Sequence, residues 1–132
     1  MLLDLSKAFD LVNQSLLLQK LHYYGLHESA VVWFRSYLNS RRQHVYVSGA
    51  YSDSGDVVSG VPQGSVLGPT LFLLYINDMP LSLSNWVADI FADDTTMSAH
   101  HHNSDDVISS LTSDLCNVML TNGALIIIWL LK

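Results

Sequence analysis

The chain has 132 residues, of which 49% are hydrophobic and 14% are charged, which excludes an intrinsically disordered chain and fits one domain with one core. Its formal net charge of −6 is the wrong sign for a self-sufficient nucleic-acid binder, so either its partner is not nucleic acid or the basic surfaces lie in other segments. A single cysteine, Cys116, excludes an internal disulfide, and we expect this side chain to lie in the core.

The beginning of the chain predicts a strand and a helix. Residues 1–5 are apolar except for Asp4, a pattern typical of a buried strand whose acid lies at a functional edge. Asn13 is a favourable N-cap for a helix that ends near Gly25, because glycine readily adopts the left-handed backbone that closes helices.

The next segment predicts a helix followed by two strands. Residues 28–38 fit a helix whose apolar face we expect to be core rather than a ligand site, and residues 39–42 form a polar link. Residues 44–47 and 56–58 predict two strands, separated by the turn-rich segment 48–55. The expected core face of the helix comprises Ala30, Trp33, Phe34, Tyr37 and Leu38.

A glycine-rich loop and an apolar helix follow. Residues 60–64 predict a rigid loop, and the helix then begins at Ser65 or Gly68 and ends at Ile76. Pro69 is compatible with this helix only in its first turn, where its missing N–H has no intrahelical partner to lose.

The last third predicts another helix and an apolar tail. The helix covers residues 104–120, and its apolar face comprises Val107, Ile108, Leu111 and Leu115. The apolar run 124–131 is far shorter than the roughly 20 residues of a membrane span. We therefore expect it to be a core strand or helix that lacks its packing partner, with membrane insertion as the less favoured alternative, and we expect no membrane partner.

Two adjacent acids, Asp93 and Asp94, lie between the strand-like segments 87–91 and 95–97, which predicts a hairpin with these two carboxylates at its tip. Neighbouring like charges repel unless a cation neutralises them, and carboxylate oxygens suit Mg²⁺. If the first strand lies beside this hairpin, Asp4 comes within reach of Asp93, and three carboxylates could surround two divalent ions. Such an ion pair supports displacement at phosphorus. The simpler alternative for an isolated acid pair is a solvated turn.

Three motifs in this order resemble those of reverse transcriptases. Residues 3–10 (LDLSKAFD) resemble their motif A, residues 60–69 (GVPQGSVLGP) their motif B, and residues 91–94 (FADD) their motif C. Residues 33–38 and 73–78 are similar to the non-LTR (LINE-type) retrotransposon branch of that family.

We expect an α+β fold in which a polymerase palm-like antiparallel sheet has helices packed on one face. The resemblance implies an RNA-directed DNA polymerase that adds dNTPs to the 3′ end of a DNA primer on an RNA template, with two Mg²⁺ ions or Mn²⁺ in their place. The implied catalytic metal ligands are Asp4, Asp93 and Asp94. The implied nucleotide-binding residues are Phe9, whose ring would exclude a 2′-hydroxyl, and Gln63 and Gly64 of motif B.

Other polar residues near the motifs have simpler interpretations. Asp10 is expected to be structural, in the turn before the next helix, and Lys7 is expected to be solvated, with phosphate contact as its alternative role. Asp89 is expected to be solvated or at the sheet edge. Residues 100–102 are three histidines that could attract zinc or nickel, but consecutive residues point to alternating sides, so we expect a solvated loop.

The pattern departs from the family at both ends, since the chain begins inside motif A and the likeness fades after Leu115. Residues 1–132 are thus expected to be a partial reverse transcriptase domain, a palm without the fingers and thumb that would supply basic surfaces. Two alternatives stay open: a catalytically inactive palm fragment that neither binds primer-template nor turns over, and an RNA-directed RNA polymerase. The single cysteine fits a reducing, intracellular compartment, and the sequence does not distinguish the nucleus from the cytoplasm.

Overall fold

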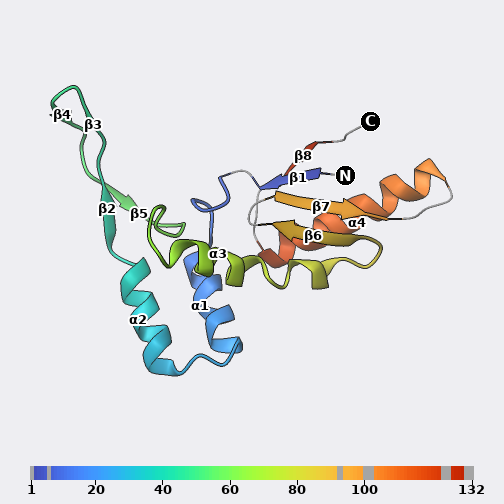
Figure 1. Cartoon of the computed structure of the whole chain (residues 1–132), viewed down its shortest axis with the longest axis horizontal. Coiled ribbons are helices and arrows are strands. Elements are labelled where there is room, and N and C mark those ends of the chain that lie inside the picture. Colours follow the sequence, from blue (N-terminus) through green and yellow to red (C-terminus); the bar gives the residue numbers. More distant parts are fainter. Residues whose placement is uncertain (1, 6, 92–93, 100–102, 123–125, 130–132) are drawn as a thin grey trace.

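A computed structural model describes residues 2–5, 7–91, 94–99, 103–122 and 126–129 of the chain. Helices and antiparallel sheets are mixed along it, which confirms the expected α+β class (Figure 1). The helices are α1 (Gln14–Tyr23), α2 (Glu28–Leu38), α3 (Gly68–Ile76), the short 3₁₀ helix η1 (Met79–Ser82) and α4 (Ser104–Asn122). The strands are β1 (Leu2–Leu5), β2 (Arg41–Gln43), β3 (Tyr46–Val47), β4 (Ala50–Tyr51), β5 (Gly55–Val57), β6 (Val87–Phe91), β7 (Asp94–Ser98) and β8 (Ile126–Trp129).

The largest sheet has the strand order β6-β7-β1-β8, and each neighbouring pair in it is antiparallel. In β7, the buried Thr95 and Met97 alternate with the exposed Asp94, Thr96 and Ser98, so one face of the sheet is covered and the other is open. Met97 belongs to a buried cluster that includes a leucine of α4. Helices therefore pack on one face of the sheet, as the sequence predicts.

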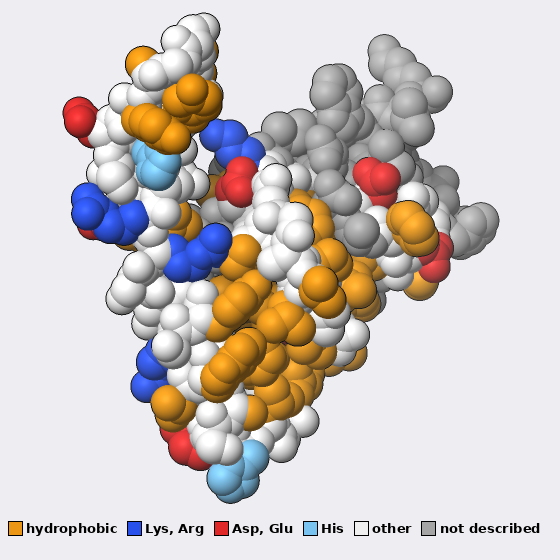
Figure 2. All heavy atoms as spheres, turned by 60° about the vertical axis from the view of Figure 1, so that its left-hand side comes forward, with side chains coloured by type: hydrophobic (Ala, Val, Ile, Leu, Met, Phe, Trp, Pro, Cys, Tyr) orange, Lys and Arg blue, Asp and Glu red, His pale blue; other side chains and the backbone are white. Residues whose placement is uncertain are grey.

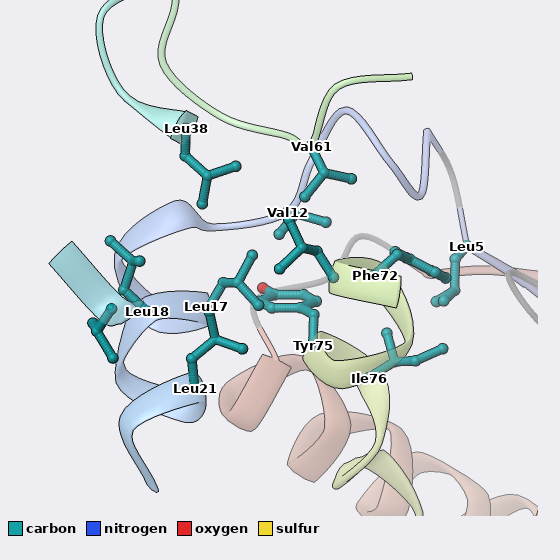
Figure 3. Close-up of a cluster of buried hydrophobic side chains, with 12 residues drawn as sticks. Leu5, Val12, Leu17, Leu18, Leu21, Leu38, Val61, Phe72, Tyr75 and Ile76 are labelled. Atoms are coloured by element: carbon teal, nitrogen blue, oxygen red, sulfur yellow. The ribbon is translucent and has the colours of Figure 1, made fainter. Parts of the chain in front are cut away.

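The main core lies where α1, α2 and α3 meet (Figure 3). Helix α1 supplies Leu17 and Leu21, and α3 supplies Leu71 and Phe72, each at most 2% exposed. Burial of one such side chain contributes roughly 1.5–3 kcal/mol, so this cluster is the main force that holds the three helices together. The other buried members are Leu5, Val12, Leu18, Val31, Leu38, Val61, Tyr75 and Ile76, and Leu5 connects the cluster to β1.

Both ends of α1 are fixed by the residues that the sequence indicates. The Asn13 side-chain oxygen accepts a 3.0 Å hydrogen bond from the backbone N–H of Leu16, which is the expected N-cap. Gly25 follows the helix with φ of 87°, and its N–H and that of Leu26 donate back to carbonyls of the last turn. These two bonds form the closure that a left-handed glycine makes possible.

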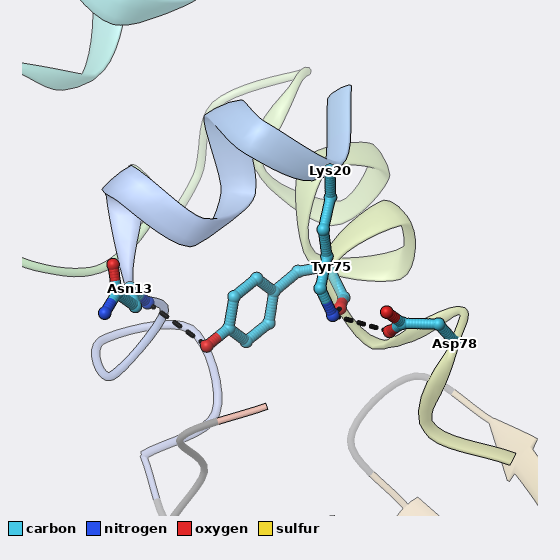
Figure 4. Close-up of polar contacts among 4 residues, drawn as sticks. All are labelled: Asn13, Lys20, Tyr75 and Asp78. Carbon is cyan, nitrogen blue, oxygen red and sulfur yellow. Dashed lines mark hydrogen bonds and ion pairs between the residues drawn. The ribbon is translucent and has the colours of Figure 1, made fainter. Parts of the chain in front are cut away.

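A buried lysine joins α1 to the end of α3 (Figure 4). Lys20 is only 7% exposed, and its Nζ donates to the carbonyl oxygen of Tyr75 at 2.7 Å and to the carboxylate of Asp78. The Tyr75 hydroxyl accepts a 3.4 Å hydrogen bond from the Asn13 backbone N–H. Burial raises the pKa of this hydroxyl; the Asn13 bond opposes the rise, and the charge of Asp78 adds to it. The same region thus contains both an ion pair and a tyrosine held in its neutral form.

The aromatic face of α2 lies only partly in the core. Leu38 is buried as expected, but Trp33 is 54% exposed, and its ring stacks on that of Tyr37 with centroids 5.5 Å apart. Val31, which lies outside the expected face, is buried. Val31 and Leu38 are seven positions apart and form one stripe in the cluster with α1, which leaves Trp33 on the outer side of the helix.

The segment after α2 forms one long hairpin that projects from the body of the protein (Figure 1). The strands expected at 44–47 and 56–58 overlap β3 and β5, whereas β2 and β4 are not expected from the sequence. The base of the hairpin pairs β2 with β5, and its tip pairs β3 with β4 around Ser48 and Gly49, whose φ values are 51° and 86°. Strand β2 extends out of the expected polar link at 39–42. Since the hairpin strands are largely exposed, they lack the apolar alternation by which a half-buried strand is predicted.

Helix α4 has close to the expected bounds, but its buried residues differ from those expected. Leu115 is buried, whereas Ile108 is 63% exposed, and the fully buried residues include Asp114 and Val118. Cys116 is exposed, so the expectation that it lies in the core is wrong. Leu111 packs against the same cluster as Leu115, so part of the expected face is correct, and Asp114 and Val118 extend the buried surface beside it.

Strand β8 pairs antiparallel with β1. The apolar run 124–131 therefore contains a strand, which is one of the two expected alternatives. The expectation that it lacks a packing partner is wrong as far as the backbone is concerned, because β8 pairs with β1. Across the part of the chain that the structure describes, no helix combines the length and hydrophobicity that crossing a bilayer requires.

Candidate active site

The first strand lies beside the acidic hairpin, which is the arrangement that the expected metal site requires. Strands β1 and β7 are antiparallel neighbours, and their register places the Cα of Asp4 opposite that of Asp94 (Figure 1). Phe91 of β6 in turn pairs with Asp94, so Asp94 belongs to β7, and the expectation that both acids form the link of the hairpin is wrong. The Asp94 side chain is exposed on the open face of the sheet. Asp93 lies outside the described residues.

The rest of the predicted metal chemistry can be placed only in part. Among the side chains that the structure describes, no three His, Cys, Asp or Glu residues form a cluster able to hold a metal ion. The side chains of two of the three predicted ligands are not among these, since only the backbone of Asp4 is described and Asp93 lies outside the described residues. The histidines at 100–102 also lie outside the described residues. Asp89 is exposed on the edge strand β6, as expected.

The loop that contains motif B packs directly on the loop that follows motif A. The Val61 N–H donates to the carbonyl of Phe9 at 2.8 Å, and the Gly60 N–H donates to the carbonyl of Val12, also at 2.8 Å. Gly60 has φ of +83°, and a Cβ at this position would lie 2.8 Å from the carbonyl oxygens of Phe9 and Asp10. Only glycine therefore permits this close approach. The two segments, about 50 positions apart, are held together by backbone atoms.

The side chain of Asp10 holds the motif B glutamine, Gln63, by a hydrogen bond. The Gln63 Nε2 donates to Asp10 Oδ1 at 2.9 Å, and the Ser59 hydroxyl donates to the Asp10 carbonyl at 2.9 Å. The Asp10 N–H closes a turn to the carbonyl of Lys7 at 2.9 Å. Asp10 thus has the turn position expected for it, together with a contact to Gln63 that the sequence does not indicate.

The predicted nucleotide-binding residues meet at one hollow, which we call the Phe9 hollow. It has a volume of about 260 Å³ and is lined by Phe9, Pro62, Gln63, Gly64 and Pro69. The Phe9 ring is half-buried because it packs on the ring of a core residue of α3, with the two centroids 4.6 Å apart. An extra Cβ on Gly64 would meet nothing within 4 Å, so this glycine is needed for its φ of +75° and not for space.

A second and larger cavity, which we call the basic cavity, lies at the base of the projecting hairpin. Its volume is about 610 Å³, and its lining includes Lys7, Asp10, Arg41, Arg42 and Gln63. Sequence reasoning missed it, because Arg41 and Arg42 form no basic stripe with Lys7 along the chain. The sequence does contain one signal for this cavity. Two adjacent arginines, Arg41 and Arg42, follow the helix that ends at residue 38 and begin the segment that leads to motif B.

Comparison with known proteins identifies the family to which this geometry belongs. The family model described as reverse transcriptase (RNA-dependent DNA polymerase) matches residues 1–124. The chain belongs to the reverse transcriptase family. Members of this family generally use divalent metal ions, and the full enzymes act on a nucleic-acid template and primer.

Individual relatives of this reverse transcriptase chain come from mobile elements. It is 43% identical over 84 residues to a probable RNA-directed DNA polymerase from transposon X-element of Drosophila melanogaster, covering 59% of this chain and 8% of that protein. It is 42% identical over 78 residues to the RNA-directed DNA polymerase from mobile element jockey of the same species, again covering 59% and 8%. The jockey polymerase of Drosophila funebris is 33% identical over 121 residues, covering 92% of this chain and 12% of that protein. The chain therefore spans only about a tenth of the length of these curated relatives.

Proposed function

We propose that this chain is the catalytic palm of a non-LTR retrotransposon RNA-directed DNA polymerase, which adds dNTPs to the 3′ end of a DNA primer on an RNA template. In this proposal residues 1–132 are part of one reverse transcriptase domain, whose fingers and thumb belong to other segments. The observation that carries the proposal is the register of β1 and β7, which pairs Asp4 with Asp94 next to Asp93 in the chain.

The three acids fit a site for divalent cations. Like charges at directly opposite positions of antiparallel strands are destabilising, so the pairing of Asp4 with Asp94 favours a bound cation nearby. Position 94 alternates with the buried Thr95, so Asp94 belongs to the open face of the sheet. Carboxylate oxygens are suitable ligands for Mg²⁺, with Mn²⁺ as an alternative.

In this proposal Asp4, Asp93 and Asp94 hold two ions at that open face. When bound, such ions neutralise charge on the attacking and leaving oxygens in a displacement at phosphorus. The contribution of the chain is positioning: β1 is fixed on both sides by β7 and β8, so the acid at position 4 is held by a rigid central strand rather than by a loop.

The Phe9 hollow is proposed to receive the incoming nucleotide. The Phe9 ring is braced by its aromatic contact and would leave no room for a 2′-hydroxyl, which favours deoxynucleotides. Gln63, held by Asp10, would present its amide to the nucleotide or the template. Gly64 would leave the backbone accessible at the same wall of the hollow.

Primer extension in a complete polymerase tests this function. The jockey polymerase segment that matches this chain is replaced by the chain itself, and extension on an RNA template is measured with Mg²⁺. We expect Asp4→Asn and Asp93→Asn each to lower the extension rate roughly a hundredfold or more. The matched control is Asp89→Asn, the same chemical change at an exposed site on β6, which should leave the rate unchanged. An active Asp93→Asn chimera would refute the metal assignment.

A second candidate function concerns the 132-residue segment by itself, which we propose does not extend primers. Its net charge of −6 and its coverage of about a tenth of its relatives support this proposal, since most of the basic surface of a polymerase would then lie elsewhere. Extension by the purified segment, lost on Asp93→Asn, would contradict it.

A further inference from the structure

Helix α2 lies at the outer edge of the protein, beside α1, and exposes apolar side chains (Figure 1). Its inner side joins the core cluster through Val31 and Leu38. On its outer side, Val32 is 50% exposed and Trp33 is 54% exposed. Figure 2 shows this side of the protein, where hydrophobic side chains gather in a broad patch below the projecting hairpin. Large apolar side chains at adjacent exposed positions of one helix are typical of a contact surface.

Two opposite charges lie on one flank of α2. Glu28 is in its first turn and Arg35 in its last, and both line one hollow of about 520 Å³ between α1 and α2. Seven positions span about 10 Å along a helix axis, and the two groups form no ion pair with each other. Arg35 forms no ion pair with any side chain that the structure describes. Glu28 lies 3.8 Å from Nδ1 of His22, and both of these side chains are about two-thirds exposed, at 65% and 67%.

This arrangement is complementary to itself under a two-fold axis. When a second copy of α2 packs antiparallel on the outer side, the charged flank meets the same flank of the partner in reversed order. Glu28 then faces the partner's Arg35, and Arg35 faces the partner's Glu28. The midpoint of the two charges lies between residues 31 and 32, so Val32 and Trp33 lie next to the axis and meet their own counterparts. One patch used twice in this manner is the pattern of an isologous dimer.

We propose that α2 is the contact surface of a homodimer, in which two copies of α2 pack antiparallel with Val32 and Trp33 at the centre and a Glu28–Arg35 pair at each end. The Trp33 ring stacks on that of Tyr37 with an interplanar angle of 8°, so it is held in place before the copies associate. Tryptophan and arginine are also residue types enriched at protein interfaces. One helix of 11 residues from each copy makes a small contact, so the dissociation constant should be roughly micromolar.

Sedimentation equilibrium of the 132-residue chain measures this association, and charge reversal tests its antiparallel geometry. Glu28→Arg alone, or Arg35→Glu alone, brings like charges together at both ends of the contact, and each should weaken the homodimer roughly tenfold. A mixture of these two variants should form a heterodimer close to wild-type strength, because every reversed charge then meets an opposite one. Trp33→Ala should weaken the wild-type homodimer roughly tenfold or more.

The matched control is Asp106→Arg. Asp106 is an exposed acid in the first turn of α4, so its reversal loses the same favourable interaction with a helix N-terminus as Glu28→Arg but lies outside α2. It should leave the dissociation constant unchanged. Mixing also separates geometry from stability, because two variants that were merely unstable would not restore each other.

Several outcomes would overturn the inference. A wild-type chain that stays monomeric well above micromolar concentration would leave this face to a different partner. A mixture that associates no more tightly than either single variant would exclude the antiparallel pairing. An equal loss in Asp106→Arg, or a dimer that survives Trp33→Ala and both reversals, would assign association to another surface. Since the measurement requires neither metal nor nucleic acid, it is independent of the proposed function.

Discussion

The side-chain amide of Gln63 donates a 2.9 Å hydrogen bond to Oδ1 of Asp10, across 53 positions of the sequence. This bond joins the turn after β1 to the loop before α3, so the residue after the motif A phenylalanine positions the motif B glutamine. Both side chains are exposed, and neither is needed for the core. The contact therefore sets the direction of the amide at the Phe9 hollow, where the proposed function would have it meet the nucleotide or the template.

Loss of the Asp10 carboxylate should weaken nucleotide binding without unfolding the protein. In the chimeric polymerase we expect Asp10→Ala to raise KM for dNTP roughly two- to tenfold, the equivalent of one hydrogen bond, with a smaller change in kcat. Asp10→Asn retains an oxygen that can accept the Gln63 amide and should stay close to the wild type. If the two variants have equal KM values, Asp10 does not act through Gln63.

Gly60 and Gly64 should differ in their tolerance of alanine, although both have positive φ. The left-handed backbone costs an L-residue roughly 1–2 kcal/mol, which should be the whole effect of Gly64→Ala. Gly60→Ala adds a Cβ that would lie 2.8 Å from two carbonyl oxygens, and we expect it to cost about 2–4 kcal/mol. Urea unfolding of both variants measures the difference. Equal losses of stability would show that the motif B loop can move away from the motif A loop.

The Phe9 ring should decide which sugar is accepted. We expect Phe9→Val in the chimera to lower the ratio of kcat/KM for dNTP over rNTP roughly tenfold or more, because the smaller side chain makes room for a 2′-hydroxyl. The control is Phe72→Leu, which removes the ring that contacts Phe9 from a position outside the hollow. It should lower stability yet retain most of the selectivity. A Phe9→Val variant with unchanged selectivity would remove Phe9 from the nucleotide site.

Elements with local signals could be predicted from the sequence. The side chain of Asn13 caps α1, Gly25 follows its end in the left-handed conformation, and Pro69 lies in the first turn of α3, each because the physical cause is contained within a few neighbouring residues. The pairing of β1 with the acidic hairpin could be stated only as a condition for the metal site, since strand partners far apart in sequence leave no local trace.

Contacts between distant segments account for what the sequence could not indicate. The basic cavity forms because the hairpin brings Arg41 towards Lys7, and the strand that contains Arg41, β2, starts in a polar segment without a strand-like pattern. Trp33 looks like a core residue by hydrophobicity, yet the position of α1 determines that Val31 is buried instead. In both cases the deciding quantity is where a neighbouring element packs.

Asp114 is a further residue whose role no sequence pattern signals. It is fully buried on α4, and its Oδ2 accepts the backbone N–H groups of Ser84, Asn85 and Trp86 at 2.9–3.2 Å. Asp114→Ala would leave these donors unsatisfied, so we expect a loss of roughly 2–4 kcal/mol in the free energy of unfolding. Asp106→Ala, an exposed acid on the same helix, should cost less than about 1 kcal/mol. Similar losses for both variants would deny Asp114 this anchoring role.

The buried hydroxyl of Tyr75 should make the protein sensitive to alkali. Its pKa is raised, chiefly by burial, so at high pH the unfolded chain loses this proton before the folded protein does. The contribution of Tyr75 to stability is therefore fully present below about pH 10, the pKa of an unfolded tyrosine. It is lost as the pH rises through the raised pKa of the folded state. Thermal unfolding of the wild type and of Tyr75→Phe measures this loss. The measurements cover about pH 8 to pH 11, which brackets the ordinary pKa of tyrosine.

The comparison isolates Tyr75 from the other tyrosines, which are retained in both proteins. Tyr75→Phe should lose less stability per pH unit above pH 10, while at neutral pH it should lose the 3.4 Å hydrogen bond that the hydroxyl accepts from Asn13. The exposed Tyr23, which is 87% exposed, provides the control, because Tyr23→Phe should retain the wild-type pH dependence. Parallel curves for the wild type and Tyr75→Phe would mean that the hydroxyl ionises equally in both states, and that the Lys20 and Asp78 region is open to water.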